Sequence, residues 1–419
     1  MKTISCIGLG DRGTEYLRFI KHFNSKKIKV TALCDIKKSA LDEIAPIYKI
    51  PENMRFLSAD EFFKNGALSD AVIISTQDKT HFDITKRAIE AGYKYILLEK
   101  PVSDKIEECI ILRDMAKERG VTIVVCHVLR YSDYYRTIKD AIRSGAIGEL
   151  ISINHVENIG YFHFSHSYVR GSWRREELSS PSILAKCCHD LDLLGWFVDK
   201  KPVAVSSTGG LHYFKRENAP EGAAERCLAG CKAKENCVYD CEALYITDPI
   251  WRATFLRLKG RTITGVKGAT KEQKYQALKE GPYGRCVYQS DNDVCDHQIV
   301  NILFEDGKTA TLTMTAFSAQ CHRESQIVGT KGEIIARKGK IYLKVFKQFK
   351  KNINKSLLRL PGHIEGDIRT VASFVRLVNG ELKNMEDVTT IDATIQSHRL
   401  AHLAEISRKS GGELVKYEE

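Results

Sequence analysis

Two polar side chains in the stretch SPSILAKCCHDLDLLGWFV have the types and the spacing of a proton-transfer pair. If the stretch is a helix, Lys186 and His189 lie on consecutive turns of one face, together with Ile183 and Asp190. An amine and an imidazole beside a bound substrate can donate and accept a proton, and burial or a neighbouring cation tunes either group. The pattern predicts an acid–base site, and it leaves open a core histidine bonded to a backbone carbonyl.

A third candidate for chemistry is Lys100, which follows the apolar run YKYILLEKP. A lysine at the carboxyl end of a buried strand could hydrogen-bond a substrate hydroxyl, with Pro101 holding the backbone extended. The alternative is that Lys100 only forms an ion pair with Glu99 at the surface and has no role in chemistry. Polar residues end the neighbouring apolar runs in the same way, namely Ser75, Thr76, His127 and Arg130.

These side chains need a scaffold, and the chain begins with one. A short apolar run from Lys2 leads into Gly8-x-Gly10-x-x-Gly13, and helical spacing follows it. Such glycines allow a tight turn, close approach of a pyrophosphate and close helix–strand packing. Asp35 ends the next apolar run, 22 residues after Gly13, where a carboxylate would bond the ribose hydroxyls of NAD and repel the 2′-phosphate of NADP. Lys37 and Lys38 lie nearby, so NADP remains an alternative cofactor.

Apolar runs and helical stretches continue to alternate up to VTIVVCHV, which predicts a parallel, doubly wound sheet over residues 1–127. Strand patterns dominate residues 128–360, and FEDGKTATLTM reads as a hairpin that turns at Asp306-Gly307. We expect an open, mostly antiparallel sheet there, a loop at 250–285 that is rich in Lys, Gly and Thr, and helices over 361–419 that pack on the first domain.

The stretch HVENIGYFHFSHSYVRGSWRR is unusually rich in aromatic and polar residues. Aromatic faces next to directional hydrogen-bonding groups suit a sugar ring. The candidate substrate contacts are Tyr161, His163, His166, Arg170 and Trp173. A metal held by His163 and His166 is a weaker alternative, because no carboxylate has the spacing of a known metal motif.

An insert at residues 225–245 carries Cys227, Cys231, Cys237 and Cys241, and Cys286 could replace Cys241. Four thiols so close in sequence could hold a structural zinc ion, although the spacing is not that of the usual pairs. An iron–sulfur cluster and free thiols are the alternatives. Nothing in the insert indicates a catalytic metal.

Composition excludes several classes of protein. The net charge of +11 is concentrated between Arg337 and Arg359, where Ile341 and Leu343 alternate with polar residues as in a half-exposed strand. We therefore expect no nucleic-acid partner. Apolar runs are too short to span a membrane, and the N-terminal residues do not resemble a secretory signal. Thirteen cysteines without such a signal indicate reduced thiols and a cytoplasmic protein.

The chain resembles the Gfo/Idh/MocA family of NAD(P)-dependent sugar and polyol oxidoreductases. The resemblance rests on GLGDRG with Asp35, on STQDKTH, on LLEKPVS and on SSPSILAKCCHDLDLLGWF. It continues through CHVLRYSDYYRTIKDAIRSGAIGELISI, CDHQIVNILF and VGTKGEI, in the order of the family. It implies an N-terminal Rossmann domain and a C-terminal α+β domain with an open, mostly antiparallel sheet, in a homo-oligomer such as a dimer or tetramer.

The same resemblance implies roles for particular residues. Lys100, His189 and Lys186 would be the catalytic groups, with Asp190 or Asp192 orienting the histidine or packing near it. Many relatives carry an acidic residue four positions before this histidine, and Ala185 stands there instead. The substrate would contact Lys100, Lys186 and His189 in addition to the aromatic stretch. The expected NAD-binding residues are Gly8, Gly10, Asp11, Arg12, Gly13, Asp35, Ser75, Thr76, His81, Glu99, Lys100, His127 and Arg130.

The leading hypothesis is hydride transfer between NAD(P) and a secondary alcohol of a sugar, polyol or glycoside. A second hypothesis is redox-neutral cleavage or rearrangement of a glycoside through a transient keto-sugar, with NAD retained. A third is a non-catalytic protein that senses NAD or a sugar. The density of proton-transfer residues argues against the third.

Overall fold

The computed structural model describes residues 1–247, 260–266, 268–354 and 363–418. The chain divides into two compact units, and each is assembled from separate stretches of sequence. The first unit comprises Met1–Ile151, Cys188–Lys201 and Val328–His402. The second comprises Ser152–Cys187, Pro202–Ile327 and Leu403–Glu419.

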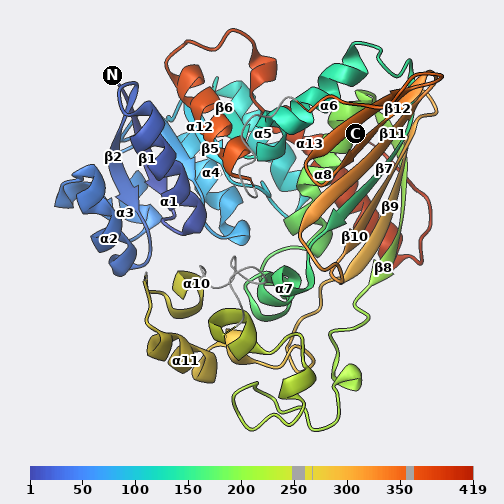
Figure 1. Cartoon of the computed structure of the whole chain (residues 1–419). Coiled ribbons are helices and arrows are strands. Elements are labelled where there is room, and N and C mark those ends of the chain that lie inside the picture. The colour runs from blue at the N-terminus through green and yellow to red at the C-terminus, as the bar shows by residue number, and fades with distance from the viewer. Residues whose placement is uncertain (248–259, 267, 355–362, 419) are drawn as a thin grey trace. The chain divides into compact units, whose positions relative to one another are not determined.

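The first unit contains a six-stranded parallel sheet in the order β3-β2-β1-β4-β5-β6 (Figure 1). Its central strands are short and apolar, as expected for strands that are buried on both faces. The predicted doubly wound sheet is confirmed. Its strands are β1 (Lys2–Ile7), β2 (Ile28–Cys34), β3 (Arg55–Phe56), β4 (Ala71–Ile74), β5 (Tyr95–Leu98) and β6 (Thr122–Val125).

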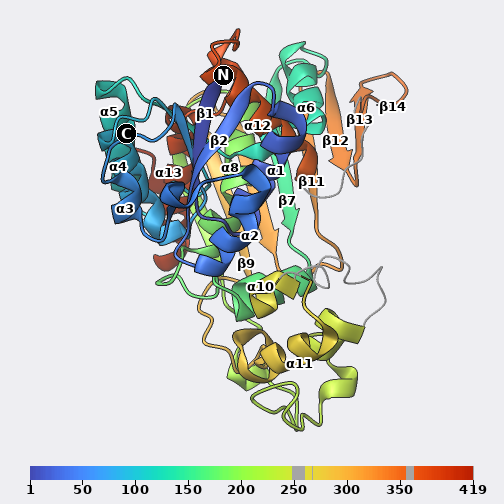
Figure 2. The same ribbon diagram turned by 90° about the vertical axis from the view of Figure 1, so that its left-hand side faces the viewer.

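Helices cover both faces of this sheet because successive side chains of each strand point to opposite sides. Ile4 and Cys6 of β1 pack with helices α1, α2 and α12, whereas Ile7 packs with α4, α5 and α13. Figure 2 shows α1 and α12 next to β1 and β2. The helices are α1 (Asp11–Phe19), α2 (Lys38–Tyr48), α4 (His81–Glu90), α5 (Ile106–Glu118), α12 (Ile364–Val378) and α13 (Ile391–Lys409).

The shorter helices of the chain are α3 (Ala59–Phe63), α6 (Asp133–Arg143), α7 (Tyr161–Phe164), α10 (Gly260–Thr264) and α11 (Lys271–Glu280). The expected loop at 250–285 is wrong where α10 and α11 form. Thr270 and Gln273 cap the first turn of α11 reciprocally, a local signal that composition alone does not reveal. Residues 250–259 of that expected loop lie outside the described residues.

A second sheet has nine strands in the order β14-β13-β12-β11-β7-β10-β9-β8-β15. It is mostly antiparallel, as predicted, although β10 pairs with β7 in parallel. Its strands are β7 (Leu150–Asn158), β8 (Pro202–Gly210), β9 (His297–Phe304), β10 (Thr309–Thr315), β11 (His322–Gly329), β12 (Gly332–Arg337), β13 (Lys340–Val345), β14 (Lys351–Asn352) and β15 (Val415–Lys416).

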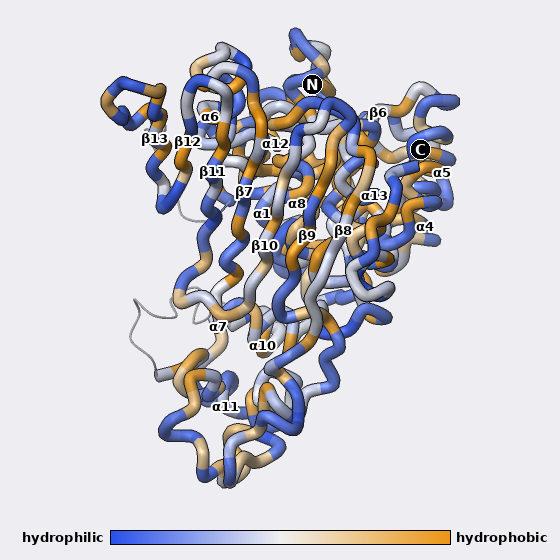
Figure 3. Tube along the Cα trace, turned by 90° about the vertical axis from the view of Figure 1, so that its right-hand side faces the viewer, coloured by the Kyte–Doolittle hydropathy of each residue, from blue (hydrophilic) through white to orange (hydrophobic). Residues whose placement is uncertain are grey.

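One face of this sheet is buried. Along β10 the buried residues Ala310, Leu312 and Met314 alternate with threonines, so apolar and polar positions interleave (Figure 3). The β9–β10 hairpin turns at Gly307, whose φ of 81° suits glycine, as the sequence predicted. β13 buries Ile341 and Leu343, so the basic run begins as a half-buried strand, again as predicted.

Helix α8 (Ser182–Val198) carries both Lys186 and His189, and its helical form confirms the periodicity argument. Among the helices of the described residues, none combines the length and the apolar character that crossing a membrane requires.

Candidate functional site

The glycine turn between β1 and α1 has the geometry that a dinucleotide needs. Gly8 has a φ of 90°, and a Cβ there would lie 2.5 Å from the carbonyl oxygen of Ser75. A Cβ on Gly13 would lie 2.0 Å from the carbonyl oxygen of Gly8, so both positions require glycine to close the turn. In the described part of the chain, no atom lies within 4 Å of a Cβ added at Gly10. The space next to Gly10, at the start of α1, therefore fits a pyrophosphate.

Asp35 is fixed at the end of β2. Its carboxylate accepts hydrogen bonds from the backbone N–H of Leu9 (2.7 Å) and of Lys37 (2.8 Å). These bonds join the second strand to the glycine turn and hold a negative charge beside it. Lys38, a neighbouring cation, forms an ion pair with Asp42 at 2.8 Å. The arrangement fits NAD better than NADP, because a 2′-phosphate would meet this carboxylate.

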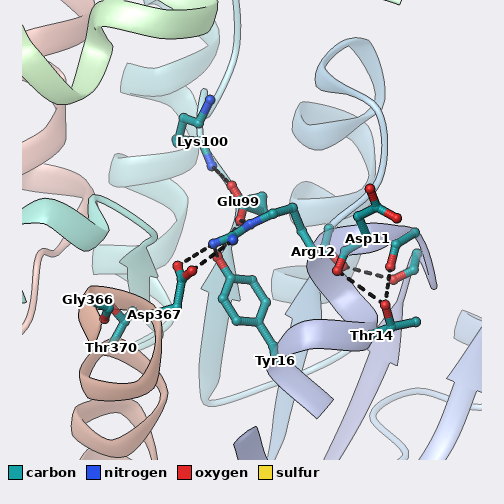
Figure 4. Close-up of polar contacts among 12 residues, drawn as sticks. Asp11, Arg12, Thr14, Tyr16, Glu99, Lys100, Gly366, Asp367 and Thr370 are labelled. Atoms are coloured by element: carbon teal, nitrogen blue, oxygen red, sulfur yellow. Dashed lines mark hydrogen bonds and ion pairs between the residues drawn. The ribbon is translucent and has the colours of Figure 1, made fainter. Parts of the chain in front are cut away.

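Arg12 links three parts of the first unit (Figure 4). Its Nε donates to the Glu99 carboxylate at 2.7 Å, and Nη1 and Nη2 donate to the two oxygens of Asp367 at 3.0 and 2.5 Å. The hydroxyl of Tyr16 donates to Glu99 as well. Burial alone would raise the pKa of Glu99, but the cations of Arg12 and Lys100 hold it below its usual value. Arg12 and Glu99 thus fasten α1, the end of β5 and α12 together.

Other predicted cofactor residues shape the ends of the strands. The Ser75 hydroxyl donates to the carbonyl oxygen of Gly8 at 2.9 Å and so closes the glycine turn. His81 is fully buried, with Nδ1 2.6 Å from the carbonyl oxygen of Pro101 and Nε2 3.3 Å from that of Thr76. Asp11 is exposed in the first turn of α1.

Lys100 lies at the end of β5, before Pro101, and its backbone N–H donates to Glu99 at 3.0 Å. Burial raises the pKa of the Cys188 thiol to about 12, and the Lys100 ammonium is the largest influence that opposes the rise. Burial lowers the pKa of His127 well below its usual value, and Arg130 and Lys100 lower it further. The charge of Lys100 therefore influences the pKa of Cys188 on α8 and the pKa of His127 at the end of β6.

His189 is buried on α8 among other imidazoles. Its ring centroid is 5.5 Å from that of His127 and 5.6 Å from that of His363. Cys188, which feels the charge of Lys100, precedes it directly. Lys100 and His189 are 89 positions apart in sequence, and what links them is His127, whose pKa Lys100 lowers and whose ring packs against that of His189.

Arg130 and Asp192 form a bidentate ion pair with two distances of 2.6 Å. Burial raises the pKa of Asp192, and the guanidinium of Arg130 opposes this. Asp192 lies one turn after His189 and 4.0 Å from Nδ1 of His127. The pair therefore fixes α8 against the end of β6, and a role of Asp192 in orienting His189 stays a prediction.

Lys186 belongs to the second unit and pairs with a residue of the same unit. Its Nζ lies 3.3 Å from the Glu157 carboxylate, which also pairs with Nε of Arg323 at 2.9 Å. The Glu157 side chain is 2% exposed, so one buried carboxylate of β7 meets two cations. Sequence reasoning missed the roles of Glu157, Arg323, Asp367 and His398. Each comes from a strand or helix whose only local signal was its periodicity.

The aromatic stretch separates into two groups. Tyr161, His163 and Trp173 are partly exposed, and Nδ1 of His163 lies 3.8 Å from Sγ of Cys321. His166 is buried, bonds the hydroxyl of Tyr245 at 3.0 Å and stacks on Tyr283. Arg170 is also buried, among backbone carbonyls and cysteines. Both side chains are enclosed by the cysteine-rich segment and its neighbours, and their contact with a sugar stays a prediction.

The cysteines of the insert approach one another, but not as the simple four-residue set. Within the described residues, the compact group of ligand atoms consists of Sγ of Cys227, Sγ of Cys241 and a carboxylate oxygen of Asp240, all within 4.8 Å of one another. Cys231, Cys237 and Cys286 line a small cavity together with Cys227.

Two family models match the chain. Residues 2–127 match the GFO_IDH_MocA model described as an oxidoreductase family with an NAD-binding Rossmann fold. Residues 139–416 match its companion, described as the C-terminal alpha/beta domain of the oxidoreductase family. Together they cover both sheets.

Relatives and solved structures agree with these matches. YteT of Bacillus subtilis, named an oxidoreductase, is 23% identical over 349 residues, which cover 80% of this chain and 76% of YteT. The 2,7-anhydro-N-acetylneuraminate hydratase of Escherichia coli is 26% identical over 204 residues, which cover 49% of this chain and only 51% of the hydratase. The 1,5-anhydro-D-fructose reductase of Ensifer adhaerens is 34% identical over 176 residues, 40% of this chain and 48% of the reductase.

An inositol dehydrogenase homologue from Azotobacter vinelandii, solved with NAD+, superposes with a TM-score of 0.71 at 14% identity and covers 99% of this chain and 97% of its own. The scyllo-inositol dehydrogenase of Lactobacillus casei, solved with NAD(H) and scyllo-inositol, gives a TM-score of 0.66 at 16% identity and covers 99% of both chains. At these identities the likeness shows the fold.

Proposed function

Because this chain belongs to the Gfo/Idh/MocA oxidoreductase family, we propose that it transfers a hydride between NAD and a secondary alcohol carbon of a sugar, polyol or glycoside. The main support for the proposal is that the charge of Lys100 acts on two residues adjacent to His189. The charge of Lys100 acts on Cys188, which precedes His189 in α8, and on His127, which packs against its ring.

NAD would be held by the turn from Gly8 to Gly13 and by Asp35. The space at Gly10 suits the pyrophosphate, and the oriented carboxylate of Asp35 suits the ribose hydroxyls. The nicotinamide supplies the hydride chemistry when it is bound. The pinned charge of Asp35, with Lys38 already paired to Asp42, favours NAD over NADP.

The residues of the chain supply proton transfer and charge stabilisation. Lys100 donates a hydrogen bond to the reacting oxygen and stabilises the negative charge that develops there. His189 accepts the hydroxyl proton in oxidation and returns it in reduction. Lys186, together with the partly exposed Tyr161, His163 and Trp173, would contact the rest of the substrate.

A second candidate function is redox-neutral elimination or hydration on a sugar that is oxidised transiently. Two features favour it, the similarity to the hydratase over half of each chain and the buried Glu157 with its two cations. A carboxylate beside Lys186 gives this chain a further proton-transfer group, and such a group could act on the C–H bond next to a transient ketone.

Two measurements on one purified preparation test both functions. Mass spectrometry and absorbance after denaturation determine whether NAD(H) accompanies the protein. A panel of inositols, hexoses, uronic acids and glycosides is then assayed with and without added NAD. NADH formation that requires added NAD supports the dehydrogenase. Retained cofactor with product formation that needs no added NAD supports the redox-neutral reaction. Absence of both NAD binding and turnover across the panel would overturn the proposal.

A further inference from the structure

A buried arginine lies at the centre of the cysteine-rich segment. Arg170 is 1% exposed, and its Nε and Nη2 donate to the carbonyl oxygens of Arg285 (2.7 Å) and Tyr239 (2.8 Å). Nη2 also lies 3.5 Å from Sγ of Cys227. Over the described residues, Nη1 of Arg170 has no hydrogen-bond partner. A buried cation needs negative charge nearby, and Asp240, which lines the same cavity, is one group that supplies it.

Apart from Asp240, most of the groups around Arg170 that could carry a negative charge are thiols. The electrostatic neighbours of its guanidinium are Cys227, Cys241 and Cys286, together with the phenol of Tyr245. Neutral thiols do not balance a guanidinium. Thiolates do, and a bound metal ion keeps thiols deprotonated.

The backbone is built to bring these cysteines together. The N–H of Cys227 donates to the carbonyl of Gly284 at 3.0 Å, and the N–H of Cys286 donates to that of Glu225 at 2.8 Å. This ladder joins two segments that are about sixty residues apart in sequence. Sγ of Cys227 and Sγ of Cys241 lie within 4.8 Å of each other. Two sulfurs on one tetrahedral zinc ion are about 3.8 Å apart, so at most a small movement would let both bind the same ion.

The space among the cysteines fits one ion. A cavity of about 10 Å³ is lined by Arg170, Asp240, Cys227, Cys231, Cys237 and Cys286, among others. That volume accommodates a single water-sized sphere. A cluster of several irons and sulfides would not fit without displacing the walls.

We propose that this cysteine cluster is a structural metal site that takes up one thiophilic divalent ion, zinc, with Arg170 as the buried counter-charge. Cys227 and Cys241 supply two thiolates, Asp240 supplies a carboxylate oxygen, and one of Cys231, Cys237 and Cys286, which line the cavity, supplies the fourth ligand. An ion with three thiolates and one carboxylate carries a net negative charge, which the guanidinium offsets through Nη2 and the unpartnered Nη1.

The metal would organise a segment that has little other structure. Between residues 211 and 240 the regular elements are two single 3₁₀ turns, Arg216–Asn218 and Lys234–Asn236. Such a short, loop-rich segment buries little apolar surface, and metal ligation commonly stabilises segments of this kind.

The test measures metal in the full-length protein, purified without chelator from zinc-supplemented cells. Elemental analysis is expected to give one zinc per chain. Cys227→Ser and Cys241→Ser should each lose it, whereas the matched control Cys109→Ser, a buried cysteine of α5, should retain it. Arg170→Lys should keep the metal, because the charge is kept, and Arg170→Met should release it faster to a chromogenic chelator.

A second measurement keeps the proposal testable if the serine variants do not fold. The metal is removed from wild-type protein with a chelator, and the metal-free protein is titrated with Co²⁺. We expect sulfur-to-cobalt charge-transfer bands, together with the strong visible absorption of tetrahedral cobalt. Metal-free wild-type protein that gives no such bands would overturn the proposal. So would iron with acid-labile sulfide, or a Cys227–Cys241 disulfide in a non-reducing peptide map.

Discussion

The imidazole of His127 packs edge-on against that of His189, with ring centroids 5.5 Å apart and ring planes at 84°. His127 is fully enclosed, and its pKa is lowered well below the usual value by burial and then by Arg130 and Lys100. It is therefore uncharged at neutral pH, and its neutral ring packs against the ring of His189. The histidine at the end of β6 thus limits the orientations of the histidine on α8.

Replacing Lys100 by Met should lower kcat by about 10²–10⁴-fold on whichever sugar or polyol proves to be the substrate, because the reacting oxygen loses its charged hydrogen-bond donor. NAD affinity, measured by calorimetry, should change little. Lys94→Met, at an exposed lysine of the same unit, is the control and should keep full activity. Equal turnover in Lys100→Met and wild type would remove Lys100 from the mechanism.

Two substitutions in the glycine turn should separate its effect on protein stability from its effect on NAD binding. Gly13→Ala should lower Tm, since its Cβ would lie 2.0 Å from the carbonyl oxygen of Gly8. Gly10→Ala should leave Tm unchanged, because the space around a Cβ there is open in the described structure. The same methyl group should weaken NAD binding about tenfold or more, a loss of roughly 1.4 kcal/mol or more. If Gly10→Ala binds NAD as tightly as wild type, the pyrophosphate lies elsewhere.

The Arg130–Asp192 pair should contribute substantially to stability. Asp192→Asn leaves Arg130 beside a neutral amide in a buried site, and the expected loss is on the order of 3 kcal/mol. Asp42→Asn is the matched control, because the side chains of Asp42 and of its partner Lys38 are 53% and 75% exposed. Its loss should be below about 1 kcal/mol. Urea denaturation of both variants measures the difference, and equal losses would contradict the importance of the buried pair.

The buried histidines should make the first unit sensitive to acid. The pKa of His398 is lowered to about 3, by burial and then by its neighbour His127, with Asp192 and Lys100 also nearby. The unfolded side chain has a pKa of about 6.5, so between these values the unfolded state binds the extra proton. Stability should therefore fall as pH falls from about 6.5 towards 3, by about 1.4 kcal/mol per pH unit for this group.

His398→Gln isolates this effect. The amide oxygen of Gln can still accept the N–H of Val102, which Nε2 of His398 accepts at 2.9 Å, but it does not titrate in this range. Plots of unfolding free energy against pH should be shallower for the variant below pH 6.5 and should have the same slope above it. Identical slopes throughout would show that His398 is protonated in the folded protein.

Much of the site rests on signals that are local in sequence. The run from Lys2 to Gly13 predicts a strand, a turn and a helix, because glycine conformation and side-chain periodicity depend on near neighbours. The same holds for α8, whose periodicity set Lys186 and His189 on consecutive turns. The family resemblance of these motifs then indicated NAD and a sugar or polyol substrate, and the family models match both domains.

Only the tertiary structure decided which distant groups meet. Arg12 pairs with Asp367, which is 355 positions away, and Lys186 pairs with Glu157 on a strand. Arg170, expected at a sugar, is buried among cysteines. Periodicity reports which face of an element is buried, but the partner across that face depends on how the whole chain packs. Long-range pairs such as these are therefore set by packing, while the turn at Gly8 and the helix of His189 are set by the sequence around them.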